Sequence, residues 1–129
     1  MALVLNEEQV MLKDSAAGFL AQNATVSHLR ALRDSDNERG FSDEVWAEMV
    51  QMGWAGIAIP EAYGGLGYGY TGLGLVLEQM GRNLTVSPLQ SSVLLAATLI
   101  GELASAEQKE RLLPAIAGGE MLVSLALQE

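Results

Sequence analysis

Signals that start and stop helices recur along this chain, and they restrict its fold more than any other feature of the sequence. Asn6 precedes two acidic residues and then Gln9, which is the pattern of a capped helix start. Apolar residues recur at helical spacing from there to about residue 22. A second helix is predicted over residues 25–34, because apolar side chains again share one side.

The central part of the chain carries two more helix patterns. Ser42 precedes acidic residues, so it is expected to cap a helix that ends near Gly53. Another helix is predicted over residues 71–83. Three methionines fall on the apolar faces of these helices, where core packing is the expected role: Met49, Met52 and Met80.

Two further start signals lie in the last third of the chain. Ser87 followed by Pro88 predicts a helix that lasts to about residue 104. Ser105 begins a capping-box pattern, which predicts a short helix that ends before Pro114. The chain is therefore expected to form an all-α domain, an up-down, bundle-like arrangement of about six helices.

A glycine-rich stretch, IPEAYGGLGYGYTGLG, occupies residues 59–74 and contains the G-x-G-x-x-G pattern of dinucleotide-binding sites at residues 67–72. Such a site needs a strand that leads directly into the glycines and an acidic residue about 20 positions later. Residues 60–62 separate the one candidate strand, WAGIAI, from the glycines, and no acidic residue lies around Ser91 and Ser92. The expected role of the glycines is a tight connection between two helices, with positive φ angles and close backbone approach.

The last ten residues, EMLVSLALQE, have a different pattern. They predict a β-strand, because one set of alternate positions is apolar: Met121, Val123, Leu125 and Leu127. A lone strand has no ladder for its N–H and C=O groups. We therefore expect it to pair either with another chain or with a sheet that continues beyond Glu129, and we favour the second.

Charge and composition exclude several function classes. The net charge is −9 and Lys and Arg together number only 7, so nucleic acid and anionic membrane surfaces are not expected partners. The chain has no cysteine, hence no disulfide and no zinc–thiolate site. Its start, MALVLNEEQ, does not have the pattern of a signal peptide. The longest apolar run, residues 93–101, is shorter than the roughly 18 residues that span a bilayer.

The ionisable residues do not form a self-contained active site in the sequence. His28 has no recognisable Ser or Cys partner, so it is expected to be an exposed helix residue. Glu44 with Glu48, and Glu107 with Glu110, have the spacing of one helix face, yet their neighbours are caps and surface positions. We interpret these pairs as solvated helix faces rather than as an acid–base pair. No cluster of His, Asp and Glu has metal-ligand spacing.

Three segments, read in order, resemble one family. VWAEMVQMGWAGIAIPEAYGGLGYG (residues 45–69) is similar to the W…GW-G-(I/V)-PE-x-(Y/F)-GG-x-G run of acyl-CoA dehydrogenases. LEQMGRNLTVSP (residues 77–88) resembles their E-E-L-G-R…P segment. Residues 101–129 resemble their G-S-x-x-Q-K-x-x-x-L-P-x-x-x-x-G-E-x…A-L-T-E stretch. The resemblance covers essentially the whole chain, in order and nearly without gaps.

The resemblance implies a flavoenzyme of three parts: a helical front domain, a middle β-domain and a rear four-helix bundle. Residues 1–119 would be the N-terminal helical domain, and residues 120–129 the start of the middle β-domain. FAD is the implied cofactor and α,β-desaturation of an acyl-CoA thioester the implied reaction. A glutamate removes the α-proton while the β-hydrogen passes as hydride to the flavin. In the family this base comes from the rear part, so no residue here is expected to be catalytic.

The resemblance also implies partners. These are an acyl-CoA substrate, an electron-transfer flavoprotein as the electron acceptor, and further subunits in a homo- or hetero-oligomer. The coenzyme A phosphates would be held mainly by other domains, because this chain has few basic residues. The segment GRNLTVSP looks more like bacterial catabolic members, which implies a bacterial, cytoplasmic location.

Two groups of residues are expected to touch ligands on this resemblance. The first lies in and beside the place of the family's A-L-T-E strand, which contacts the flavin: Leu125, Ala126, Leu127 and Gln128. Gln128 stands where the family has Thr, and it keeps a donor and an acceptor on a longer side chain. The second group lies on the helix that resembles a wall of the acyl-chain cavity: Leu89, Ser92 and Val93.

Two alternatives remain open. An acyl-CoA oxidase or related flavin oxidase would differ in whether oxygen or an electron-transfer flavoprotein reoxidises the flavin. A free-standing, non-catalytic helical domain would use its apolar surface and last strand to bind a partner. That second alternative predicts a soluble, monodisperse and colourless monomer, whereas an enzyme fragment is expected to associate or to dissolve poorly.

Overall fold

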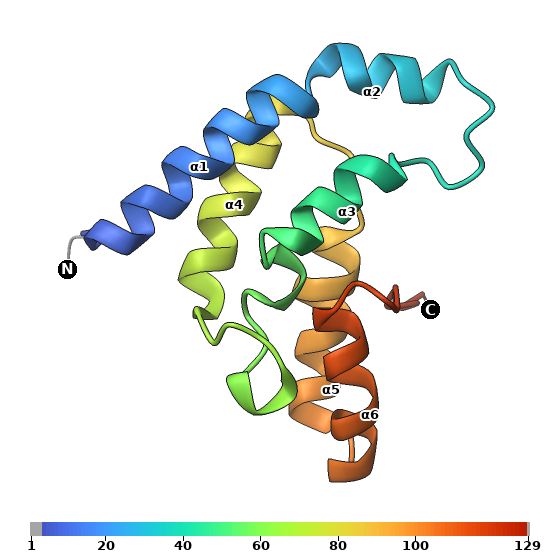
Figure 1. Cartoon of the computed structure of the whole chain (residues 1–129). Helices are drawn as coiled ribbons and strands as arrows, with labels where there is room; N and C mark the ends of the chain where they lie inside the picture. The colour runs from blue at the N-terminus through green and yellow to red at the C-terminus, as the bar shows by residue number, and fades with distance from the viewer. Residues whose placement is uncertain (1–3, 129) are drawn as a thin grey trace.

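The computed structural model describes residues 4–128, and every regular element in that range is helical (Figure 1). The α-helices are α1 (Glu7–Asn23), α2 (Val26–Arg33), α3 (Asp43–Gln51), α4 (Gly69–Asn83), α5 (Thr98–Leu103) and α6 (Ala106–Ala117). Two short 3₁₀ turns precede α4, η1 (Trp54–Gly56) and η2 (Glu61–Tyr63), and a π-helix, η3 (Leu89–Ala97), leads directly into α5. Within residues 4–128, no helix combines the length and the apolar character that a membrane crossing requires.

The first three α-helices each begin at a side-chain cap, and the caps of α1 and α3 are those that the sequence predicts. At the start of α1 the Asn6 side chain accepts from the Gln9 N–H at 2.8 Å, and the Gln9 side chain accepts from the Asn6 N–H at 3.0 Å. The hydroxyls of Thr25 and Ser42 cap α2 and α3 by accepting from the third N–H of each helix. These helix predictions are confirmed to within one or two residues at each end.

The helices form two groups around one core. α1 lies along α4, while η3, α5 and α6 pack against one another (Figure 1). The two groups meet at η1, where the rings of Phe19 and Trp54 make an edge-to-face contact with centroids 5.6 Å apart. Met49 and Met80 are buried and Met52 packs against the core, as predicted. The predicted all-α, bundle-like fold class is therefore confirmed.

The last third of the chain differs from prediction in two places. Residues 89–97 form a π-helix instead of the first turns of an α-helix. Apolar periodicity does not separate i→i+4 from i→i+5 bonding, so the sequence held no signal for this change. In addition, α6 passes through Pro114 and ends at Ala117. Proline removes only one donor from a helix, and the Pro114 carbonyl still accepts from the Gly118 N–H at 2.9 Å.

The predicted final strand is not formed. Residues 121–128, which we call the exit segment, have no regular secondary structure. No strand exists among residues 4–128 to supply a hydrogen-bonded ladder, so the alternating pattern alone does not produce one. Met121, Leu122 and Val123 pack against the core, whereas Ser124 to Gln128 are exposed.

Candidate ligand-binding site

The glycine-rich stretch folds back on the residues that precede it, and we call residues 56–69 the glycine connection. Backbone hydrogen bonds run from the Leu66 N–H to the Gly56 carbonyl at 2.8 Å and from the Gly67 N–H to the Ile59 carbonyl at 2.9 Å. A third bond joins the Tyr68 N–H to the Ile57 carbonyl at 2.8 Å. The connection therefore satisfies its own backbone groups within the domain.

Two glycines show why this connection needs residues without a side chain. Gly64 has φ +79°, in the left-handed region that side chains disfavour. At Gly65 a Cβ atom would overlap the backbone carbonyl oxygen of Ile59. The prediction of positive φ angles and close backbone approach is confirmed at these positions.

A phosphate cradle does not fit this geometry. Such a cradle presents free N–H groups at the start of a helix. Here the N–H groups of Gly67 and Tyr68 are already bonded to carbonyls of the same loop, and WAGIAI forms a 3₁₀ turn and a bend instead of a strand. The G-x-G-x-x-G pattern in this chain is a structural connection, as predicted.

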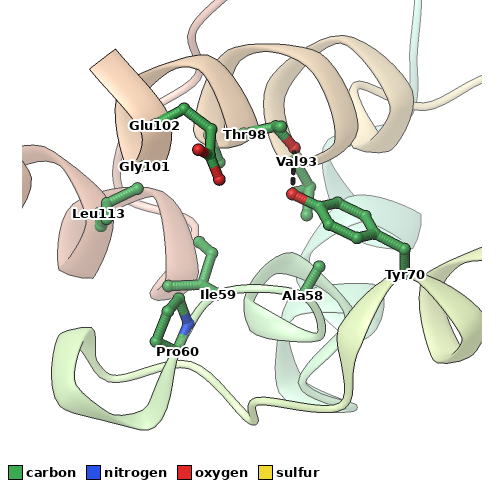
Figure 2. Close-up of a pocket in the computed structure, with 10 residues that line it drawn as sticks. Ala58, Ile59, Pro60, Tyr70, Val93, Thr98, Gly101, Glu102 and Leu113 are labelled. Carbon is green, nitrogen blue, oxygen red and sulfur yellow. Dashed lines mark hydrogen bonds between the residues drawn. The ribbon is translucent and has the colours of Figure 1, made fainter. Parts of the chain in front are cut away.

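A first hollow of about 240 Å³ lies between the glycine connection and η3, α5 and α6 (Figure 2). Ala58, Ile59 and Pro60 form one wall, and Val93 and Leu113 lie across from them. The Tyr70 hydroxyl donates to the Thr98 Oγ1 at 3.0 Å at the edge of the hollow. Glu102 also lines it, with its carboxylate turned toward the space in Figure 2. This hollow is thus partly polar and carries a charge.

A second hollow of about 470 Å³ lies on another side of the same π-helix, and we call it the apolar groove. None of its lining residues carries a formal charge. It is lined by Leu29, Leu77, Met80, Gly81, Leu84, Thr85, Val86, Gln90 and Leu94. The volume falls in the range of roughly 300–1,000 Å³ that small-molecule sites occupy, whereas the first hollow is smaller.

Leu84 holds an unusual backbone conformation at the edge of this groove. Its φ is +50°, and among residues 4–128 it alone combines a side chain with a positive φ. A left-handed residue other than glycine is strained, and such strain concentrates at functional sites. The turn is held by the Thr85 N–H, which donates to the Met80 carbonyl at 3.0 Å, and the Thr85 hydroxyl donates to the Ala24 carbonyl at 3.0 Å.

The three residues expected on the cavity wall are placed differently from one another. Val93 lines the first hollow, but Leu89 and Ser92 are buried and line neither hollow. Gln90 and Leu94 of the same helix line the apolar groove, and neither residue was predicted from the sequence. Their spacing of four residues is the signal that could have identified them as one face.

The residues expected near a flavin lie together at the end of the described chain. All four are exposed, Leu125 by 41% and Leu127 by 82%, and Ala126 and Gln128 are exposed as well. No hydrogen bond within residues 4–128 occupies the N–H groups of Ser124 to Gln128. These residues are therefore available to contact a group outside the domain.

The ionisable residues are arranged mostly as the sequence predicts. Glu44, Glu48, Glu107 and Glu110 are exposed, as expected of solvated helix faces. His28 is half-buried instead of exposed, and its Nε2 atom is enclosed with no hydrogen-bond partner among the described residues. No base, nucleophile and acid converge in either hollow. Among the described residues, the geometry is that of a helical domain with one uncharged hollow and one smaller hollow that Glu102 lines.

Comparison with known proteins identifies the family. Residues 6–120 match the model of the acyl-CoA dehydrogenase N-terminal domain. The acyl-CoA dehydrogenase FadE12 of Mycobacterium tuberculosis is 30% identical over 131 residues, which cover 99% of this chain and 32% of that protein. The mitochondrial isovaleryl-CoA dehydrogenase of Bos taurus is 32% identical over 127 residues, which cover 97% of this chain and 29% of that protein.

Solved structures agree with this assignment. A variant of the Tcur3481-Tcur3483 steroid ACAD has a TM-score of 0.84 at 36% identity, over 95% of this chain and 33% of that chain. The ChsE4-ChsE5 complex from Mycobacterium tuberculosis has a TM-score of 0.84 at 25% identity, over 96% of this chain and 34% of that chain. The chain belongs to the acyl-CoA dehydrogenase family and represents its N-terminal domain. It spans about a third of the length of the curated relatives it matches.

Proposed function

We propose that this chain is the N-terminal part of a flavin-dependent enzyme that introduces an α,β double bond into an acyl-CoA thioester. The observation that carries the proposal is the match of residues 6–120 to the N-terminal domain of acyl-CoA dehydrogenases. Residues 1–119 would form this domain, and residues 120–129 would lead into a following β-domain. The open apolar groove and the exposed exit segment support an incomplete site that other parts of the protein finish.

The apolar groove is the better candidate for the wall that receives the acyl chain. Its lining is uncharged and its volume is about 470 Å³, while the first hollow has Glu102 and about 240 Å³. An alkyl chain gains about 25 cal/mol for each Å² of apolar surface that it buries. Contact with Leu77, Met80 and Leu94 would therefore favour an alkyl chain over water. Of the residues first expected there, Val93 would contribute only to the smaller hollow.

The exit segment has the properties that contact with FAD requires. Leu125 and Leu127 are exposed apolar side chains that a flat ring system could cover, and the neighbouring N–H groups are free within the described residues. The Gln128 amide can both donate and accept a hydrogen bond. When bound, the flavin supplies the acceptor for the hydride from the β-carbon.

The contribution of this chain to the reaction would be binding, orientation and exclusion of water. Holding the acyl chain in a groove presents its α and β C–H bonds at one fixed place, which lowers the entropic part of the barrier. Apolar walls also keep water away from the reacting carbons. We assign no proton acceptor to this chain, because no glutamate of the described residues lines the groove.

The proposal includes partners and a location. An acyl-CoA is the proposed substrate, and an electron-transfer flavoprotein is the proposed electron acceptor. A solved structure of an electron transferring flavoprotein of Acidaminococcus fermentans, with a TM-score of 0.74 at 29% identity, supports the choice of acceptor. The ChsE4-ChsE5 complex supports assembly with like or unlike subunits. The bacterial relatives support the bacterial cytoplasm as the location.

A chimeric enzyme tests this function directly. Residues 1–129 would replace the matching third of FadE12, which this chain aligns with over 99% of its length. We expect the purified chimera to bind FAD, and a straight or branched acyl-CoA to bleach the flavin under anaerobic conditions. A folded chimera that binds no FAD, or whose flavin no acyl-CoA reduces, would overturn the proposal. Reoxidation by oxygen, with release of hydrogen peroxide, would identify the oxidase alternative.

Two leucine variants of the chimera test the groove. Leu94→Ala removes apolar surface from the groove, and we expect it to raise the KM for the acyl-CoA about tenfold with less effect on kcat. Leu95→Ala is the matched control, because Leu95 follows on the same helix, is 44% exposed and lines neither hollow. Equal KM values for the two variants would place the acyl chain outside the groove.

A further inference from the structure

The hydroxyl of Ser92 makes a contact that joins two distant parts of the chain. Ser92 lies on η3 and is 1% exposed, and its Oγ accepts a hydrogen bond from the Val123 N–H at 3.0 Å. The two residues are 31 positions apart in the sequence. The bond therefore connects the π-helix to the exit segment.

This hydrogen bond lies at the point where the chain leaves the core. The Met121 N–H donates to the Ala115 carbonyl at 3.1 Å, which ties the start of the exit segment to the end of α6. Beyond Met121, the Ser92–Val123 bond is the only hydrogen bond that holds the segment within the described part of the chain. Packing against the core ends at the same place, because Val123 is half-buried and Ser124 is exposed.

The neighbouring serine shows that this arrangement is specific. Serine on a helix commonly bonds to a carbonyl of its own helix, and the Ser91 hydroxyl does so, donating to the Pro88 carbonyl at 3.1 Å. The Ser92 hydroxyl instead accepts from an amide outside its helix. A π-helix changes which side chains face a given neighbour, and such helices are frequent at functional sites. Here the π-helix places Ser92 beside the exit segment.

We propose that Ser92 is a positioning residue, whose hydroxyl fixes the exit segment at Val123 and so sets where Leu125 to Gln128 leave the domain. This role replaces the substrate contact that the family resemblance implied for Ser92, since the side chain is buried and turned toward Val123. The consequence for catalysis rests on the proposed function, in which the end of the exit segment meets the flavin.

Amide hydrogen exchange of the whole 129-residue chain tests the anchor. Ser92→Ala leaves the Val123 N–H without its acceptor, and we expect Val123 to exchange about tenfold faster or more. Ser92→Thr keeps the hydroxyl and should restore slow exchange. Where the added methyl group of Thr disturbs the core, Ser92→Cys, with a weaker acceptor, should give an intermediate rate.

Ser91→Ala is the matched control, because it removes a hydroxyl from the same helix but leaves Val123 bonded. Unchanged exchange at Val123 in Ser92→Ala would overturn the proposal. So would equal acceleration in Ser91→Ala and Ser92→Ala, which would indicate that η3 loosens as a whole.

The affinity of the chimera for FAD separates this inference from the proposed function. If Ser92→Ala accelerates exchange at Val123 and weakens FAD binding severalfold, and Ser92→Thr restores both, then the positioning role of Ser92 and the flavin contact of the exit segment are both supported. If exchange accelerates while the Kd for FAD is unchanged, the anchor stands and the flavin contact of the exit segment is wrong. If neither changes, the positioning role of Ser92 is wrong.

Discussion

The glycine connection and the exit segment are both non-helical stretches beside the same core, yet they are held in opposite ways. Three backbone hydrogen bonds join the glycine connection to itself, from Leu66, Gly67 and Tyr68 to carbonyls before Pro60. The exit segment has one side-chain anchor at Val123 and is exposed from Ser124 onward. The first stretch is held by hydrogen bonds within this domain, whereas the N–H groups of Ser124 to Gln128 in the second have no hydrogen bond within the described residues.

This difference shows why a dinucleotide-like glycine pattern is not by itself evidence of a ligand site. Glycine-rich loops hold phosphate through free backbone N–H groups. In the glycine connection the N–H groups of Gly64 to Tyr68 are bonded to carbonyls of the same loop, so these glycines serve packing. In the exit segment, which has no glycine motif, the N–H groups of Ser124 to Gln128 are unused within the described residues.

The largest effect is expected from a substitution that disrupts the glycine connection. In Gly65→Ala the new Cβ would overlap the Ile59 carbonyl oxygen, and backbone atoms cannot move aside as a flexible side chain can. We expect the free energy of unfolding to fall by about 3 kcal/mol or more, measured by urea denaturation. Gly74→Ala is the control, because Gly74 is exposed on α4 and no atom lies near a new Cβ. We expect this variant to raise the free energy of unfolding by up to about 1 kcal/mol. Similar losses in both variants would contradict the account of the connection.

A smaller effect is expected at the turn that leads into the exit segment. Gly119 has φ +72°, and a Cβ there would lie 2.5 Å from a methyl group of Val50. We expect Gly119→Ala to lower the free energy of unfolding by about 1–3 kcal/mol, measured by urea denaturation. Both the strained φ and the overlap with Val50 contribute to this loss. It should also accelerate amide exchange at Val123. Gly118→Ala, at a position with negative φ, should change stability by less than about 0.5 kcal/mol. A larger loss of stability in Gly118→Ala than in Gly119→Ala would show that the positive φ of this turn does not lie at Gly119.

The smallest effect concerns pH and the contact between the glycine connection and α1. Partial burial raises the pKa of Tyr68 above its ordinary value of 10.0, and so do the hydrogen bond to Glu8, at 3.1 Å, and the charge of that carboxylate. A raised pKa favours the protonated phenol in the folded state. Its stabilising contribution is therefore present below pH 10 and is lost as pH rises through the higher folded pKa.

Spectroscopic titration of the tyrosines measures this shift. Tyr68→Phe should remove a phenol titration that lies above the ordinary value, and Glu8→Gln should lower the pKa of Tyr68 toward that value. The stability difference between the wild type and Tyr68→Phe should shrink as pH rises above pH 10. A difference that already shrinks between neutral pH and pH 10 would assign the contact to another group.

The sequence predicted those parts of the fold that depend on local signals. Asn6, Ser42 and Ser105 each cap a helix as expected, because a cap needs only the chain within a few residues. The glycine connection was predicted because residues 60–62 separate the candidate strand from the glycines and no acidic residue follows at the required distance. The predicted end of the last helix was wrong, because α6 continues through Pro114 to Ala117.

Parts of the fold and site that depend on distant contacts could not be predicted from the sequence. Apolar periodicity carries no signal for the π-helix, and the Ser92–Val123 bond joins segments 31 positions apart in the chain. The bond between Tyr70 and Thr98 is of the same kind. The strand was wrong because its alternating pattern needs a neighbouring strand, and the described residues supply none.

Amide exchange of the FadE12 chimera, with and without FAD, tests whether the exit segment contacts the flavin while the glycine connection does not. We expect FAD to slow exchange at Leu125 to Gln128 and to leave exchange at the N–H groups of residues 64–69 unchanged. FAD-dependent protection of residues 64–69 would show that the glycines hold the dinucleotide after all. FAD binding with no protection at the exit segment would contradict the proposed flavin contact.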